Sequence, residues 1–155
     1  MKFSSKEDIE APIETVFAAL SEFETFERSA IRRGIVVDRV DETAPMAAGL
    51  AWNAAFDLRG KPRKLHLKLA EYDPPNGMRF DSESFGLEGD LIIELVALSP
   101  KRTRMGIALE LSPKTLSARL FLQSLKLAKA NLTKRFKQKV SEFAKGIEGR
   151  KTRSA

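Results

Sequence analysis

Residues 104–145 read RMGIALELSPKTLSARLFLQSLKLAKANLTKRFKQKVSEFAK, and the hydrophobic period changes once within this stretch. Up to residue 111 every second side chain is large and apolar, which predicts a β-strand with one buried face. From Thr115 to Lys145 there is no proline or glycine, and apolar side chains recur every three or four residues. This spacing predicts one long amphipathic helix, for which Ser112 is the expected N-cap and Pro113 the first helical residue.

The period of two extends upstream of this stretch as far as Ile35. Turn sequences at 60–62, 73–77 and 99–102 divide it into strands joined by short connections, which is typical of an antiparallel meander. Before it, residues 2–10 also alternate, and two short apolar stripes follow between residues 13 and 32. We therefore predict an α+β fold with about seven antiparallel strands, two short helices after the first strand and a long C-terminal helix.

Composition limits the classes of protein to consider. The 155 residues fit one domain, expected over 1–146, with a polar, frayed tail over 147–155 after Gly146. The absence of cysteine excludes disulfides and thiolate chemistry. No metal-ligand spacing and no glycine-rich phosphate loop occur, so we expect neither a metal nor a cofactor. No signal peptide or membrane-length apolar run is present, which favours a cytoplasmic protein of bacterial type.

Three segments carry a resemblance to a known family. They are DIEAPIETVF at 8–17, EYDPP at 71–75 and LSPKRTR at 98–104. The chain resembles the bacterial polyketide cyclase/dehydrase-like branch of the START-like (SRPBCC) superfamily. It departs from that family at 23–28, where FETFER stands in place of a tryptophan-bearing turn. The resemblance implies a helix-grip fold, in which a curved antiparallel sheet wraps around the long C-terminal helix.

The resemblance also implies a ligand cavity between the sheet and that helix. Its lining would be Trp52, Phe56, Leu67, Met78, Phe80, Leu91, Ile93, Met105 and Ile107 from the sheet, facing Phe121, Leu125, Leu132 and Phe136. Three polar side chains fall in the same phase as this lining and are candidate pocket groups: Glu7, Ser82 and Ser84. For any single apolar residue, plain core packing is the alternative interpretation.

Three functions follow as hypotheses. The first is binding of an apolar small molecule such as a lipid, a quinone or a polyketide-like compound. The second is a cyclase or dehydratase reaction in the same pocket, with Glu7 or a serine moving a proton. The third is an interaction protein that docks through its basic C-terminal helix. His66, the only histidine, shares its phase with Lys64 and Lys68 and is expected on the solvated face.

The C-terminal third is strongly basic. Residues 114–153 contain twelve Lys or Arg residues against two Glu. We expect a solvated face and no nucleic-acid partner, because the aromatic residues needed for base stacking are not interleaved with the charges. Leu116, Leu120 and Leu127 form a second apolar stripe, which is a candidate for a gate over the pocket, a homodimer contact or contact with an anionic membrane.

Overall fold

The computed structural model describes residues 1–154, with side chains up to Gly149. One strand is followed by two helices, six further strands and two more helices. In chain order the elements are β1 Lys2–Ile9, α1 Ile13–Leu20, α2 Phe23–Arg32, β2 Val36–Arg39, β3 Ala51–Leu58, β4 Lys61–Asp73, β5 Gly77–Ser84, β6 Leu87–Ser99, β7 Arg102–Pro113, α3 Leu116–Lys126 and α4 Lys129–Ser154.

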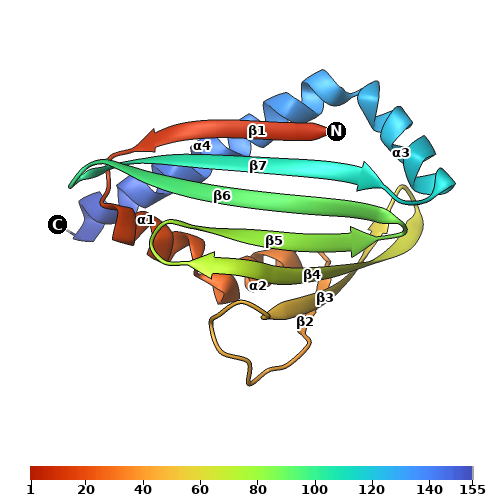
Figure 1. Ribbon diagram of the computed structural model, residues 1–155, viewed down its shortest axis with the longest axis horizontal. Coiled ribbons are helices and arrows are strands. Elements are labelled where there is room, and N and C mark those ends of the chain that lie inside the picture. Colours follow the sequence, from red (N-terminus) through yellow and green to blue (C-terminus); the bar gives the residue numbers. More distant parts are fainter. Residues whose placement is uncertain (155) are drawn as a thin grey trace.

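The seven strands form one curved antiparallel sheet in the order β1-β7-β6-β5-β4-β3-β2. Each of β2 to β7 pairs with its neighbour in sequence, and β1 closes the series by pairing with β7. Figure 1 shows α4 crossing obliquely behind β1 and β7, with α1 and α2 on the same side of the sheet. α3 lies at the opposite end of the sheet from α1. The predicted α+β helix-grip fold is confirmed.

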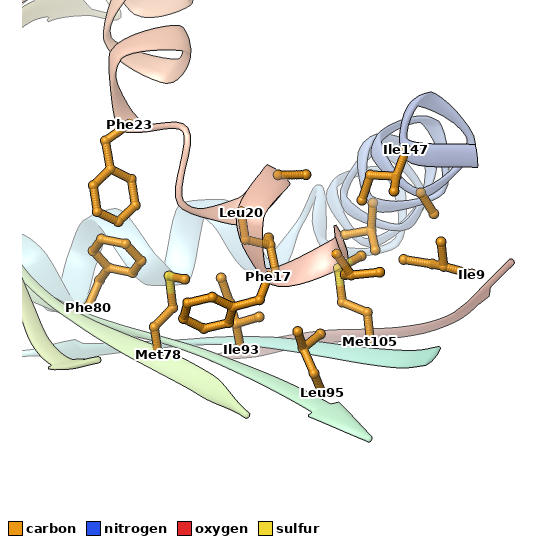
Figure 2. Packing of buried hydrophobic residues seen from close by; sticks show 14 of the residues in the cluster. Ile9, Phe17, Leu20, Phe23, Met78, Phe80, Ile93, Leu95, Met105 and Ile147 are labelled. Atoms are coloured by element: carbon orange, nitrogen blue, oxygen red, sulfur yellow. The ribbon is translucent and has the colours of Figure 1, made fainter. Parts of the chain in front are cut away.

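Side chains that alternate along the strands divide the sheet into two faces. We call the face toward α1, α2 and α4 the inner face. At the α1 end it is fully packed: Phe17 and Leu20 of α1 point toward Met78 and Ile93 of the sheet (Figure 2). Ile147 of α4 belongs to the same core cluster. Burial of these apolar side chains is the main stabilising contribution at this end.

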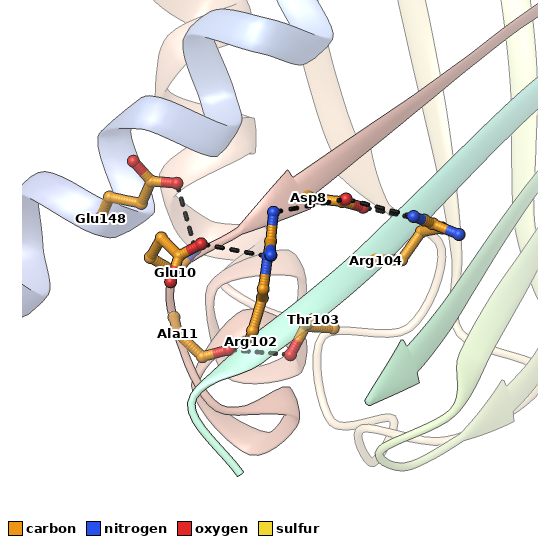
Figure 3. Close-up of polar contacts among 7 residues, drawn as sticks. All are labelled: Asp8, Glu10, Ala11, Arg102, Thr103, Arg104 and Glu148. Carbon is orange, nitrogen blue, oxygen red and sulfur yellow. Dashed lines mark hydrogen bonds and ion pairs between the residues drawn. The ribbon is translucent and has the colours of Figure 1, made fainter. Parts of the chain in front are cut away.

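Polar contacts fix the end of β1 beside β7 (Figure 3). Arg104 donates two hydrogen bonds to the carboxylate of Asp8, at 2.8 and 3.1 Å. The buried hydroxyl of Thr103 donates to the carbonyl oxygen of Ala11 at 2.8 Å. The hydroxyl thus satisfies a carbonyl that the entry into α1 would otherwise leave unpaired.

The expected start of the C-terminal helix was wrong. Ser112 and Pro113 belong to β7, where Pro113 is paired with Leu87. The N-cap is Thr115, whose hydroxyl oxygen accepts the backbone N–H of Ala118 at 3.1 Å. Ser/Thr-Pro is also compatible with the end of a strand, so the local pattern did not distinguish the two positions.

The expected single helix is two helices. α3 ends at Lys126 and α4 begins at Lys129, and the N–H of Ala128 bonds to the carbonyl of Leu125, three residues back. A straight helix over 116–154 would be about 58 Å long, whereas the longest strands, at 13 residues, span about 43 Å. The break lets α3 stay against the end of the sheet while α4 packs on β1.

The boundary expected at Gly146 does not separate the core from a tail. α4 continues through this residue to Ser154, and Ile147 is only 2% exposed. The carboxylate of Glu148 accepts the backbone N–H of Glu10 at 3.1 Å (Figure 3). Glycine inside a helix costs about 1 kcal/mol, which the burial of Ile147 offsets.

Candidate functional site

The inner face changes character along its length. Leu95 and Met105, near α1, are 5% and 0% exposed. Toward α3 the apolar side chains of the same face are only half-buried, although α3 lies at this end. We call this region the α3-end surface: Phe56, Leu58, Leu65, Leu67, Leu87 and Leu111. It is an apolar surface that the fold encloses incompletely, and it is the candidate binding site.

The structure sorts the expected lining residues into two groups. Five are buried in the core: Trp52, Met78, Phe80, Ile93 and Met105. Eight are half-buried: Phe56, Leu67, Leu91, Ile107, Phe121, Leu125, Leu132 and Phe136. Strand register places all nine of the sheet residues on the inner face. The half-buried group is the part of the expected lining that a ligand could contact without displacing the core.

The three candidate polar groups also lie on the inner face. Ser82 donates its hydroxyl hydrogen to the carbonyl of Gly89 at 3.0 Å, and Ser84 donates to the carbonyl of Lys64 at 2.6 Å. Both serines are therefore engaged with the sheet backbone. Glu7 is half-buried opposite Met105.

His66 lies on the outer face, as its phase with two lysines predicted. It is exposed, and its Nδ1 is 3.0 Å from the side-chain oxygen of Asn53. Two open hollows of about 320 and 430 Å³ adjoin it on this face. The smaller hollow is lined by charged and polar side chains, whereas the larger combines polar side chains with Val36, Ala54, Ala55 and Leu65. Both are open to solvent and do not enclose a ligand as typical sites for apolar small molecules do.

Glu27 of α2 joins three elements, a contact that the sequence analysis missed. Its carboxylate accepts two hydrogen bonds from Arg39 of β2, at 2.8 and 2.9 Å, and one from the indole N–H of Trp52 of β3 at 2.9 Å. The hydrogen bond from Arg39 lowers the pKa of Glu27, and Trp52 adds to this effect, although burial acts in the opposite direction. Phe23 then packs edge-on against Trp52 at 5.4 Å. α2 is thereby fixed against the sheet.

A second missed feature lies at the α3 end, where two hairpin turns meet α3 (Figure 1). The guanidinium carbon of Arg63 in β4 is 4.2 Å from the ring centre of Phe85, and that of Arg59 is 5.3 Å from the ring centre of Phe121. The two rings meet edge-to-face at 5.1 Å. Arg59 also donates to the hydroxyl of Ser124 at 3.0 Å. We call Arg59, Arg63, Phe85 and Phe121 the arginine–aromatic cluster.

The sequence contained a signal for Arg63. Arg63 has the same phase as Leu65, Leu67 and Leu69, and β4 pairs it with Phe56 on the inner face. A cation in an apolar phase is unusual and indicates either a partner or a ligand. Arg59 and Phe85 gave no such signal, because both lie in turns, where the alternation of the strands does not apply. In the structure both have positive φ angles, 53° and 41°.

Solved structures define the class of fold. Norcoclaurine synthase of Thalictrum flavum matches with a TM-score of 0.67 at 9% identity, over 97% of this chain and 96% of that chain. The Zhui aromatase/cyclase of Streptomyces sp. R1128 matches at 0.65 and 11% identity, over 97% and 94%. A START superfamily protein of Mycobacterium smegmatis matches at 0.52 and 15% identity, over 86% and 95%. The chain therefore has a START-like (SRPBCC) fold.

No protein-family model and no curated protein sequence matches the chain. Within residues 1–154, no cluster of three or more acidic or histidine side chains is arranged to hold a metal ion. No helix in the described part of the chain has the length and hydropathy needed to cross a membrane.

Proposed function

We propose that the protein binds an apolar small molecule against the α3-end surface, between the sheet and the helices α3 and α4. A lipid, a quinone and a polyketide-like compound are the ligand classes that fit this description. The observation that carries the proposal is the exposure gradient of the inner face, whose apolar side chains are buried near α1 and only half-buried near α3. Side chains packed as an ordinary core would be buried at both ends.

Two of the similar structures are enzymes, and this supports the proposal. One is an aromatase/cyclase, and another is a synthase solved with a transition-state analogue. Both share the sheet and helix arrangement of this chain at low identity, so this fold serves enzymes of small molecules in other proteins. A cyclase-type reaction is the second candidate, for which Glu7 is the expected proton-transfer group. Glu7 lies on the inner face but opposite Met105, at the packed end, so this reaction would require a ligand that extends beyond the α3-end surface.

We further propose that α3 makes an external contact through its outer apolar stripe. Leu116, Leu120 and Leu127 are 72%, 56% and 93% exposed. Exposed leucines beside Arg119 and Lys126 suit either a second copy of the chain or an anionic membrane surface. This contact lies on the opposite side of α3 from its buried residues, Ala118 and Leu122.

The binding proposal is tested with N-phenyl-1-naphthylamine, an uncharged apolar dye that fluoresces in apolar surroundings. We expect a saturable rise in fluorescence with one site per chain. Phe56→Asp should weaken binding at least about tenfold, because it places a charge on the apolar surface. Ile92→Asp, on the outer face at 37% exposure, is the matched control and should leave binding unchanged. An absence of saturable binding would contradict the proposal.

A further inference from the structure

The guanidinium of Arg63 is only partly satisfied within the protein. Its Nε is shielded from solvent and has no hydrogen-bond partner among the described residues. The residue is half-buried on the inner face, at the edge of the α3-end surface. A shielded N–H of a charged group without an acceptor is energetically unfavourable. The ring of Phe85 supplies a cation–π contact but no acceptor.

The neighbouring carboxylates do not neutralise the two arginines. Within the described part of the chain, neither Arg59 nor Arg63 forms an ion pair. Glu83 uses a carboxylate oxygen to accept the N–H of Gly86, and Glu88 pairs with Lys114 at 3.7 Å. Two positive charges therefore lie at one end of an apolar surface without compensating negative charge.

The arginines are held in place by the turns and by α3. Phe85 and Gly86 form the β5–β6 turn, and both have positive φ angles. Gly86 has no side chain, which leaves room for Thr115. A Cβ added at Gly86 would lie 2.4 Å from the Thr115 hydroxyl oxygen. The same threonine is the N-cap of α3. The start of α3, the β5–β6 turn and the arginine–aromatic cluster thus form one connected unit.

We infer that Arg63, with Arg59 at the rim, binds the carboxylate of an amphipathic ligand whose apolar part lies on the α3-end surface. The inference rests on the proposed function and names the ligand class: an apolar molecule that carries one carboxylate. A guanidinium presents parallel N–H groups that match the two oxygens of a carboxylate. Such a ligand would accept hydrogen bonds from the terminal N–H groups of Arg63 and would reach the shielded Nε only after the side chains covering it shift. The surroundings have low polarity, where a charge-assisted hydrogen bond is strong.

The test compares two probes of equal chain length, decanoate and decanol, by isothermal titration calorimetry at pH 8. We expect decanoate to bind at least about tenfold more tightly than decanol, because the bond between charged groups adds to the shared apolar contribution. Arg63→Gln should remove this preference, so that decanoate and decanol bind with similar affinity. Arg63→Lys retains the charge but not the paired N–H groups, and should retain only part of the preference.

Lys64→Gln is the matched control. It removes one positive charge from the adjacent residue, which is exposed on the outer face, and should leave the preference for decanoate intact. Circular dichroism melting verifies that each variant folds. Two results would overturn the inference while leaving apolar binding established. One is equal affinity of the wild type for both probes, and the other is an equal loss of the preference for decanoate in the Arg63 and Lys64 variants. Failure of both probes and of the neutral dye would overturn the proposed function itself.

Discussion

Glu27 shows how one carboxylate fixes the position of a helix. Its three hydrogen bonds come from Arg39 and Trp52, and the side chains of the ion pair are 18% and 19% exposed. Because both side chains are largely buried, water and salt weaken this ion pair less than they weaken ion pairs on the surface. Removing Glu27 would leave two donors without their acceptor at the contact between α2 and the sheet.

The first prediction concerns the pH dependence of this contact. The pKa of Glu27 is lowered from its ordinary value of 4.5. A carboxylate with a lowered folded-state pKa contributes stability above its unfolded pKa, and the contribution is lost as pH falls through the folded pKa. Glu27→Gln should therefore lower stability by about 1–3 kcal/mol at pH 7, and the difference from wild type should shrink as pH falls below about 4.5.

Melting temperatures from pH 7 to pH 3 measure this difference. Glu14→Gln, at an exposed position in the first turn of α1, is the control for loss of a carboxylate. A constant difference between wild type and Glu27→Gln across the range would show that the lowered pKa does not contribute to folding stability.

At the scale of the element, α3 has two apolar sides with different roles. Ala118 and Leu122 face the protein, whereas Leu116, Leu120 and Leu127 face outward. The break before α4 brings this helix to the end of the sheet and leaves the outer stripe exposed among the residues that the structure describes. An isolated helix of 11 residues is marginal in water, so α3 depends on its N-cap and its buried side.

The second prediction separates these two sides of α3. The double variant Leu116→Ser/Leu120→Ser should change monomer stability by no more than about 0.5 kcal/mol per site, because both leucines are exposed. Leu122→Ser, at 5% exposure, should lose about 2–5 kcal/mol. Denaturant unfolding measures both.

The same double variant tests the external contact. Sedimentation velocity, and sedimentation with anionic vesicles at two salt concentrations, should show a lower mass or weaker vesicle binding than wild type. An unchanged mass together with unchanged vesicle binding would contradict a contact role for Leu116 and Leu120.

At the scale of the whole molecule, the C-terminal segment closes the core that the N-terminal elements begin. Ile147 of α4 packs in the same cluster as Ile9 and Val16, and Glu148 accepts the N–H of Glu10. Residues more than 130 positions apart in the sequence therefore meet at the α1 end. At the opposite end the apolar side chains of the inner face stay half-buried, so the described part of the molecule is more tightly packed at the α1 end than at the α3 end.

The third prediction tests the contribution of the chain end to this closure. Ile147→Ala should lower the free energy of unfolding by about 2–5 kcal/mol, because it leaves a cavity in the core. Ile31→Ala, at an exposed position of α2, should change it by less than about 0.5 kcal/mol. Denaturant unfolding of the two variants gives both values, and equal effects would place Ile147 outside the core.

Much of the fold followed from the sequence, because the signals involved are local. Alternation along each strand determined which side chains share a face, and turn residues determined where the strands end. For this reason the antiparallel meander, the two short helices and the outward position of His66 were correctly predicted, whereas the pairing of β1 with β7 was not predicted. The nine sheet residues of the expected lining do share the inner face, since register preserves the phase of every strand. Their contact with a ligand stays a prediction.

Only the tertiary structure decided what those faces contact. No glycine or proline marks the break between α3 and α4, which lets α3 contact the end of β7 while α4 packs on β1. Ile147 is buried by elements distant in sequence, and Arg63 lies against Phe85 only because two turns meet α3. Periodicity reports the phase of a side chain within its own element, whereas burial and partners depend on how the elements pack together.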